Sequence, residues 1–89
     1  MDTSRPLELR LSGPPAPTDV GRLCALLDAA EPTVVVCDIG GLEPPGLAGV
    51  DALARLRLTA RRRGHRLVFT GAGPELRETL DLFGLGELL

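Results

Sequence analysis

The segment from Thr33 to Ile39 is an unbroken run of mainly β-branched apolar residues, with Asp38 as its one charged member. Pro32 precedes the run and Gly40-Gly41 follows it, so the run has the length of a single strand. A run of this kind is typical of a strand buried on both faces of a parallel sheet. Parallel strands need long crossover connections, which are usually helices. This segment therefore favours an α/β architecture.

The flanking sequence alternates between strand and helix patterns. Leu7 to Leu11 alternates apolar and polar residues, and Arg66 to Thr70 is a second short apolar run, so both are predicted to be strands. A helix is predicted to start at a Thr18 or Asp19 N-cap and to close before Pro32. Two further helices are expected from about 47 to 63 and from 74 to 83. The alternating order predicts a mostly parallel sheet joined by right-handed crossovers.

Size and composition restrict the class of protein. The chain has 89 residues, which is enough for one domain. Hydrophobic residues make up 44% of it and charged residues 25%, a composition that argues against disorder. The net charge of −2 and an aromatic content of 2% argue against nucleic acid as a partner. No apolar run reaches the ~20 residues of a membrane span, and no signal peptide is apparent. We expect a cytoplasmic protein that does not insert into membranes.

The basic residues are unevenly distributed. All ten are Arg, and six of them lie between Arg55 and Arg66. Such a stretch is compatible with a contact surface for an acidic partner or a phosphate. The stretch also has the pattern of a solvated helix whose last turn, Arg61 to Arg63, complements the helix dipole before Gly64. We favour the second interpretation.

Residues suited to catalysis or cofactor binding are few. His65 stands in a turn with no acid or nucleophile beside it, so we expect a solvated turn residue rather than a general base. Cys24 and Cys37 are expected to pack as small apolar residues in a reduced setting. Gly71-Ala72-Gly73 lacks the further glycine of a dinucleotide fingerprint and the Gly-Lys-Ser/Thr of a P-loop. We predict no catalytic residue, no metal and no cofactor.

Several motifs, taken in order, carry a resemblance to one family. Leu9 to Gly13 is similar to that family's strand before a Gly-Glu-Leu-Asp turn, with Pro14-Pro15 in place of Glu-Leu. The other motifs are 34–39, 43–47, 62–71, 74–77 and 82–85. In this order the chain resembles a STAS domain, the family of sulfate transporters and anti-sigma-factor antagonists. The resemblance implies a single domain over 1–89, an α/β fold with about four mostly parallel strands and three helices packed on the sheet.

The resemblance also implies a function by binding and not by catalysis. Bacterial members of the family typically dock on an anti-sigma factor or a switch kinase, so we expect a protein partner of that kind. The expected contact surface is the loop after the central strand and the helix start. Its residues are Asp38, Gly41, Glu43, Pro44, Pro45, Gly46 and Leu47. Two alternatives stay open: an accessory STAS subunit of a membrane transporter ATPase, and a nucleotide-binding module using Gly71-Ala72-Gly73 and the arginines.

The sequence departs from the family at its regulatory position. Pro44 occupies the position of the phosphorylated hydroxyl in the family's Asp-Ser-Ser-Gly-Leu motif, and Pro45 occupies the next. No Ser or Thr lies between Thr33 and Thr59. Prolines are tolerated there because amides in the first turn of a helix have no intrahelical acceptor. We therefore expect no phosphorylation in this loop.

Self-association is expected from the extent of the sheet. Most relatives have an additional N-terminal strand and a longer C-terminal segment, whereas six residues precede Leu7 here. At least one sheet edge is then expected to be unpaired, and the apolar tail from Leu85 to Leu89 to be poorly covered. A homodimer through one of these surfaces is the simplest expectation.

Overall fold

A computed structural model describes residues 6–42, 47–82, 84 and 86 of the chain. Three strands alternate with three helices, which confirms the α/β class. In chain order they are β1 (Leu7–Arg10), α1 (Pro17–Ala29), β2 (Val34–Asp38), α2 (Leu47–Arg62), β3 (Arg66–Thr70) and α3 (Pro74–Leu82).

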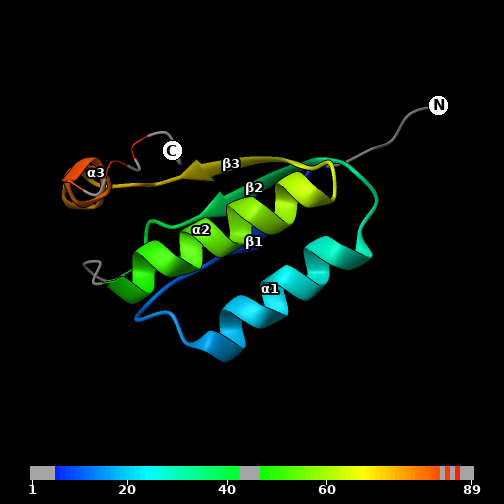
Figure 1. Cartoon of the computed structure of the whole chain (residues 1–89), viewed down its shortest axis with the longest axis horizontal. Helices are drawn as coiled ribbons and strands as arrows, with labels where there is room; N and C mark the ends of the chain where they lie inside the picture. The colour runs from blue at the N-terminus through cyan, green and yellow to red at the C-terminus, as the bar shows by residue number, and fades with distance from the viewer. Residues whose placement is uncertain (1–5, 43–46, 83, 85, 87–89) are drawn as a thin grey trace.

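The described strands form one parallel sheet in the order β1-β2-β3. The sheet thus has three described strands, one fewer than the roughly four predicted. The chain steps across the sheet in the same direction twice, so two crossovers of the same hand place their helices on the same face. Figure 1 shows this arrangement, with α1 and α2 side by side over one face of the sheet. The third helix, α3, lies beyond the carboxyl ends of the strands and not over that face.

The core fills the space between the sheet and the two helices. Val35 and Cys37 of β2 are fully buried against it, as are Leu27 of α1 and Leu53 of α2. Burial of this apolar surface is the main stabilising contribution in so small a domain.

The opposite face of the sheet is open within the described part of the chain, which corrects the prediction of a central strand buried on both faces. Val34 of β2 is 40% exposed, and Val68 of the neighbouring strand β3 is 44% exposed. The β-branched run does form the central strand, but its side chains alternate between the two faces, and α1 and α2 cover only one of them.

The helix ends follow local chemistry, with one correction. Helix α1 begins at Pro17 after an Ala16 N-cap that makes no side-chain bond, so the predicted Thr18 or Asp19 cap is wrong. Proline suits the first turn because its fixed φ is helical and its missing N–H is not needed there. Helix α2 ends as predicted before Gly64, whose φ of +78° allows the His65 amide to donate to the Ala60 carbonyl at 2.8 Å.

Candidate functional site

The predicted contact surface begins at Asp38, the last residue of β2. Its Oδ1 accepts a hydrogen bond from the Gly40 amide at 2.8 Å, and Oδ2 lies 3.9 Å from Arg10 Nε. The first contact closes an Asx-type turn, which directs the chain away from the sheet. The carboxylate therefore braces the start of the following loop.

The loop after β2 is held on one side by the loop after β3. A Cβ placed on Gly71, where φ is +82°, would lie 2.9 Å from the Gly40 Cα and 3.0 Å from Asp38 Oδ1. The Ile39 amide also donates to the Thr70 carbonyl at 2.9 Å. Only glycine at position 71 allows the two backbones to approach so closely. The sequence contained the glycines, but nothing in it paired position 71 with position 40.

On its other side the same loop is joined to the chain after β1. The Gly13 amide donates to the Gly41 carbonyl at 2.8 Å, and Gly13 forms a parallel bridge with Leu42. The Leu42 amide donates in turn to the Ile39 carbonyl at 3.1 Å. Gly41, a predicted contact residue, is exposed on a loop whose backbone is fixed from both sides. The chain therefore leaves the sheet in a preset direction toward α2.

Four of the predicted contact residues, Glu43, Pro44, Pro45 and Gly46, lie outside the described residues. Leu47 is the first residue of α2. The structure thus brings Asp38 and Gly41 together in one braced turn, and the start of α2 at Leu47 lies five positions after Leu42, the last described loop residue.

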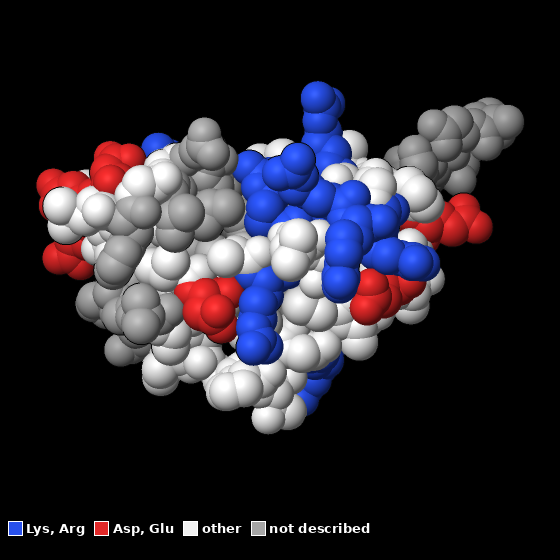
Figure 2. Space-filling model, in the orientation of Figure 1, with Lys and Arg blue, Asp and Glu red and all other residues white. Residues whose placement is uncertain are grey.

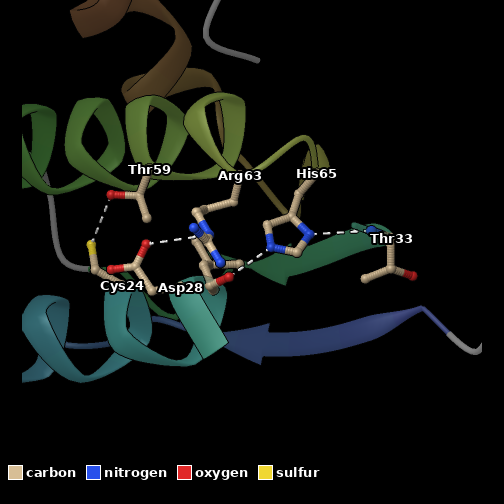
Figure 3. Close-up of polar contacts among 7 residues, drawn as sticks. Cys24, Asp28, Thr33, Thr59, Arg63 and His65 are labelled. Carbon is tan, nitrogen blue, oxygen red and sulfur yellow. Dashed lines mark hydrogen bonds and ion pairs between the residues drawn. The ribbon is translucent and has the colours of Figure 1, made fainter. Parts of the chain in front are cut away.

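His65 is a structural residue and not a solvated one, so that prediction is wrong. It is 7% exposed, and its ring bridges two segments in the close-up of Figure 3. The Thr33 amide donates to Nδ1 at 3.2 Å, and Nε2 lies 2.7 Å from the Leu27 carbonyl oxygen. Because Nδ1 accepts, Nε2 carries the hydrogen and donates. Both nitrogens are occupied, and neither is offered to a substrate.

The cysteines pack as predicted. Cys37 is fully buried, and burial, with the negative charge of Asp38 as a smaller cause, raises the pKa of its thiol to about 11. Cys24 is half-buried and accepts a hydrogen bond from Thr59 Oγ1 at 3.5 Å, between α1 and α2. A thiol with a raised pKa is a poor nucleophile and metal ligand, so Cys37 serves the core.

The elements of the suggested nucleotide site do not come together. Gly71 and Gly73 line a shallow hollow at the carboxyl edge of the sheet, with Ile39, Gly40, Leu42, Glu75 and Leu76 as the other lining residues. Its one charged lining residue is the acid Glu75, which disfavours phosphate. Arg61 and Arg62 stand in the last turn of α2, which precedes β3, whereas Gly71 follows β3. The length of the strand separates the two groups.

The described residues also bear on metal binding and on membrane insertion. They contain no cluster of three or more His, Cys, Asp or Glu side chains that could hold a metal ion. No helix among them has both the length and the apolar character required to cross a membrane.

The fold defines a small α/β module with a braced turn at the carboxyl edge of its sheet. A family model described as "Mlab, STAS domain" matches residues 2–89, and the chain therefore belongs to the STAS domain family. The resemblance inferred from the sequence is confirmed over nearly the whole chain. STAS domains are in general regulatory or binding modules and not enzymes. No curated protein and no solved structure gives a significant match.

Proposed function

We propose that this chain is a non-enzymatic STAS module that binds an anti-sigma factor or switch kinase and needs no phosphorylation to do so. The contact surface proposed for it runs from Asp38 through the following loop to Leu47 at the start of α2. The observation that carries the proposal is the bracing of this loop. The described part of this loop, residues 38–42, is fixed by the turn at Asp38 and by the contact between Gly40 and Gly71, and it therefore loses little conformational entropy on binding.

The lack of a switch follows from the residue types. The family's phosphoacceptor position is occupied by Pro44, and the nearest hydroxyl on α2, that of Thr59, is buried and donates to Cys24. A surface of this kind binds or releases its partner without a change of charge. Its control would then lie in the partner or in the amount of either protein.

The absence of a phosphoacceptor hydroxyl from this loop also favours a second candidate, an accessory subunit of a membrane transporter ATPase. A permanent subunit has no need of a reversible phosphate, so the prolines suit it at least as well. The description of the matching family model names neither a sigma factor nor a kinase. In both candidates the chain acts through the same loop and the same helix start.

Capture of partners by the tagged full chain, followed by mass spectrometry, distinguishes the two candidates. A kinase-like anti-sigma factor among the captured proteins supports the first, and an ATPase with its permease supports the second. Glu43→Arg is expected to weaken capture of either while the far-UV circular dichroism and the melting temperature stay nearly unchanged.

The matched control is Glu31→Arg, because Glu31 is exposed in the loop before β2, at the opposite end of that strand. If Glu31→Arg weakens capture as much as Glu43→Arg does, the loop after β2 is not the contact surface. Capture that depends on added phosphate donors would contradict the absence of a switch.

A further inference from the structure

The outward face of α2 carries an exposed leucine among arginines. Leu58 is 58% exposed, although it lies on a helix whose other leucines at positions 53 and 56 are fully buried. On a helix surface the neighbours of a residue are those three and four positions away. For Leu58 these include Arg55, Arg61 and Arg62, all of which are exposed. We refer to Leu58, Arg55, Arg61 and Arg62 as the α2 patch.

Ion pairs neutralise only part of the charge of this region within the described part of the chain. Between positions 51 and 66 the sequence has six arginines and one acid, Asp51. Asp51 pairs with Arg55 at 3.2 Å, and Arg63 reaches Asp28 on α1 at 3.9 Å. The ion pairs of the described residues include neither Arg61 nor Arg62. Figure 2 shows the resulting concentration of basic side chains over the C-terminal end of α2.

The helix dipole accounts for only part of this arrangement. Arg61 and Arg62 in the last turn interact favourably with the partial negative charge at the helix end. That effect gives no reason for a leucine to stand exposed beside them. An exposed apolar side chain flanked by arginines, of which Arg61 and Arg62 are in none of the ion pairs of the described residues, is the arrangement of an interface centre with a polar rim.

We propose that the α2 patch is a docking surface for an acidic amphipathic helix of a partner protein, one that places an apolar side chain against Leu58 and carboxylates against Arg61 and Arg62. This surface lies toward the C-terminal end of α2, whereas the loop of the proposed function precedes its N-terminal end. The inference therefore stands whether or not that loop binds a partner.

The chemistry of the patch selects protein over other polyanions. A nucleic-acid surface would use cations with stacking rings, but the sequence has only two aromatic residues, and Phe69 is half-buried against the core. A helix that lies on a membrane needs a wide apolar face, and the apolar face of α2 is already buried against the sheet. Leu58 with arginines around it is instead complementary to a partner surface that has one apolar residue with acidic residues around it.

The test uses the full chain and a fluorescent synthetic peptide of about four helical turns with Leu once per turn between Glu residues. Binding is measured by anisotropy at low and at physiological salt. We expect binding that weakens with salt, and that falls by about tenfold or more in Arg61→Glu/Arg62→Glu. Leu58→Ser should also weaken it. The matched control, Arg22→Glu/Arg77→Glu, reverses two exposed arginines on α1 and α3 and should bind as the native chain does.

Three probes separate the possible ligands: the same peptide with its leucines replaced by serine, a DNA duplex, and vesicles containing phosphatidylglycerol. Loss of affinity with the serine peptide supports an apolar contact at Leu58. The proposal is overturned if the acidic peptide does not bind, if Leu58→Ser binds it as well as the native chain, or if DNA or vesicles bind more tightly. Circular dichroism of each variant verifies that the fold is retained.

Discussion

The imidazole of His65 fastens the end of α1 to the turn before β3, with Nε2 2.7 Å from the carbonyl oxygen of Leu27. The other ring nitrogen, Nδ1, accepts a hydrogen bond from the amide of Thr33, which lies just before β2. One side chain thus closes the last turn of a helix and fixes the entry of the central strand. Few side chains could do both, because the site requires a donor and an acceptor on one rigid ring.

Replacing His65 by Ala should lower the free energy of unfolding by about 2–3 kcal/mol, because a buried amide and a buried carbonyl each lose their partner. Chemical denaturation monitored by circular dichroism measures the change. Arg62→Ala, at an exposed position nearby, is the control and should stay within about 0.5 kcal/mol of the native chain. Equal stabilities of the two variants would show that the ring contributes little.

Stability should fall as the pH rises from about 9 to about 11. The Cys37 thiol has an ordinary pKa of 9.0 when unfolded and one of about 11 when folded. In this window the unfolded chain loses its thiol proton while the folded chain keeps it, so ionisation favours unfolding. The expected loss is about 2–3 kcal/mol, present in full only above the folded pKa.

The composition makes this titration unusually simple to interpret. The sequence has no Lys and no Tyr, the two residue types whose ordinary pKa values of about 10 fall in the same range of pH. Cys37→Ala is less stable at every pH because a core atom is lost, but its stability should not show the same decline. An identical slope in both proteins would assign the effect elsewhere.

Gly71→Ala should destabilise the fold by about 2 kcal/mol or more, since the added Cβ would meet the backbone of Gly40 at 2.9 Å and the φ of +82° is strained for alanine. The matched control is Gly21→Ala, inside α1, where a Cβ would find open space. There alanine should stabilise by about 0.5–1 kcal/mol through helix propensity. Thermal denaturation of both variants checks the opposite signs.

Incubation with a serine kinase of the anti-sigma type and ATP should leave residues 40–59 without phosphate. The hydroxyl of Thr59 is buried, and no other Ser or Thr lies in that stretch. Peptide mapping by mass spectrometry is the measurement. Pro44→Ser, which restores a hydroxyl at the family's acceptor position, is the positive control for the kinase. A phosphorylated native peptide from this region would contradict the prediction.

Self-association remains a prediction. In the described sheet β1 and β3 each have a single neighbouring strand, so each leaves one edge unpaired. Sedimentation equilibrium at micromolar concentration should give a dimer, and Leu88→Asp/Leu89→Asp should shift it toward monomer if the C-terminal tail forms the contact. A monomer at all concentrations would show that the edges are protected without a second copy.

The sequence predicted what depends on local patterns. The alternating elements, the end of α2 before Gly64 and the start of α3 at position 74 all follow from residues close together in the chain. It did not predict the role of His65, because Leu27 lies 38 positions earlier. Nor did it predict the open sheet face, because an exposed Val34 and a buried Val35 belong to the same apolar run.

In the candidate site, too, local contacts could be predicted from the sequence and contacts between distant residues could not. The turn that Asp38 closes is a contact spanning two residues, which is of the kind that local sequence patterns can indicate. The support from Gly71 could not be read from the sequence, because it requires knowing that β2 and β3 are neighbours. Exposure of Leu58 was likewise hidden, since leucines at helical spacing look alike until the position of the sheet is known.

The strand order β1-β2-β3 has a consequence for how quickly the chain can fold. No described strand pairs with one reached through a tight turn; instead Leu7 pairs with Val35, and Val34 with Arg66, each about 30 positions apart. The first rung of either ladder thus forms only after a long loop has closed, a cost in entropy that precedes any gain. The helices can form within microseconds, but the sheet must await their docking. We therefore expect α1 and α2 to organise the transition state around the central strand, which both ladders share.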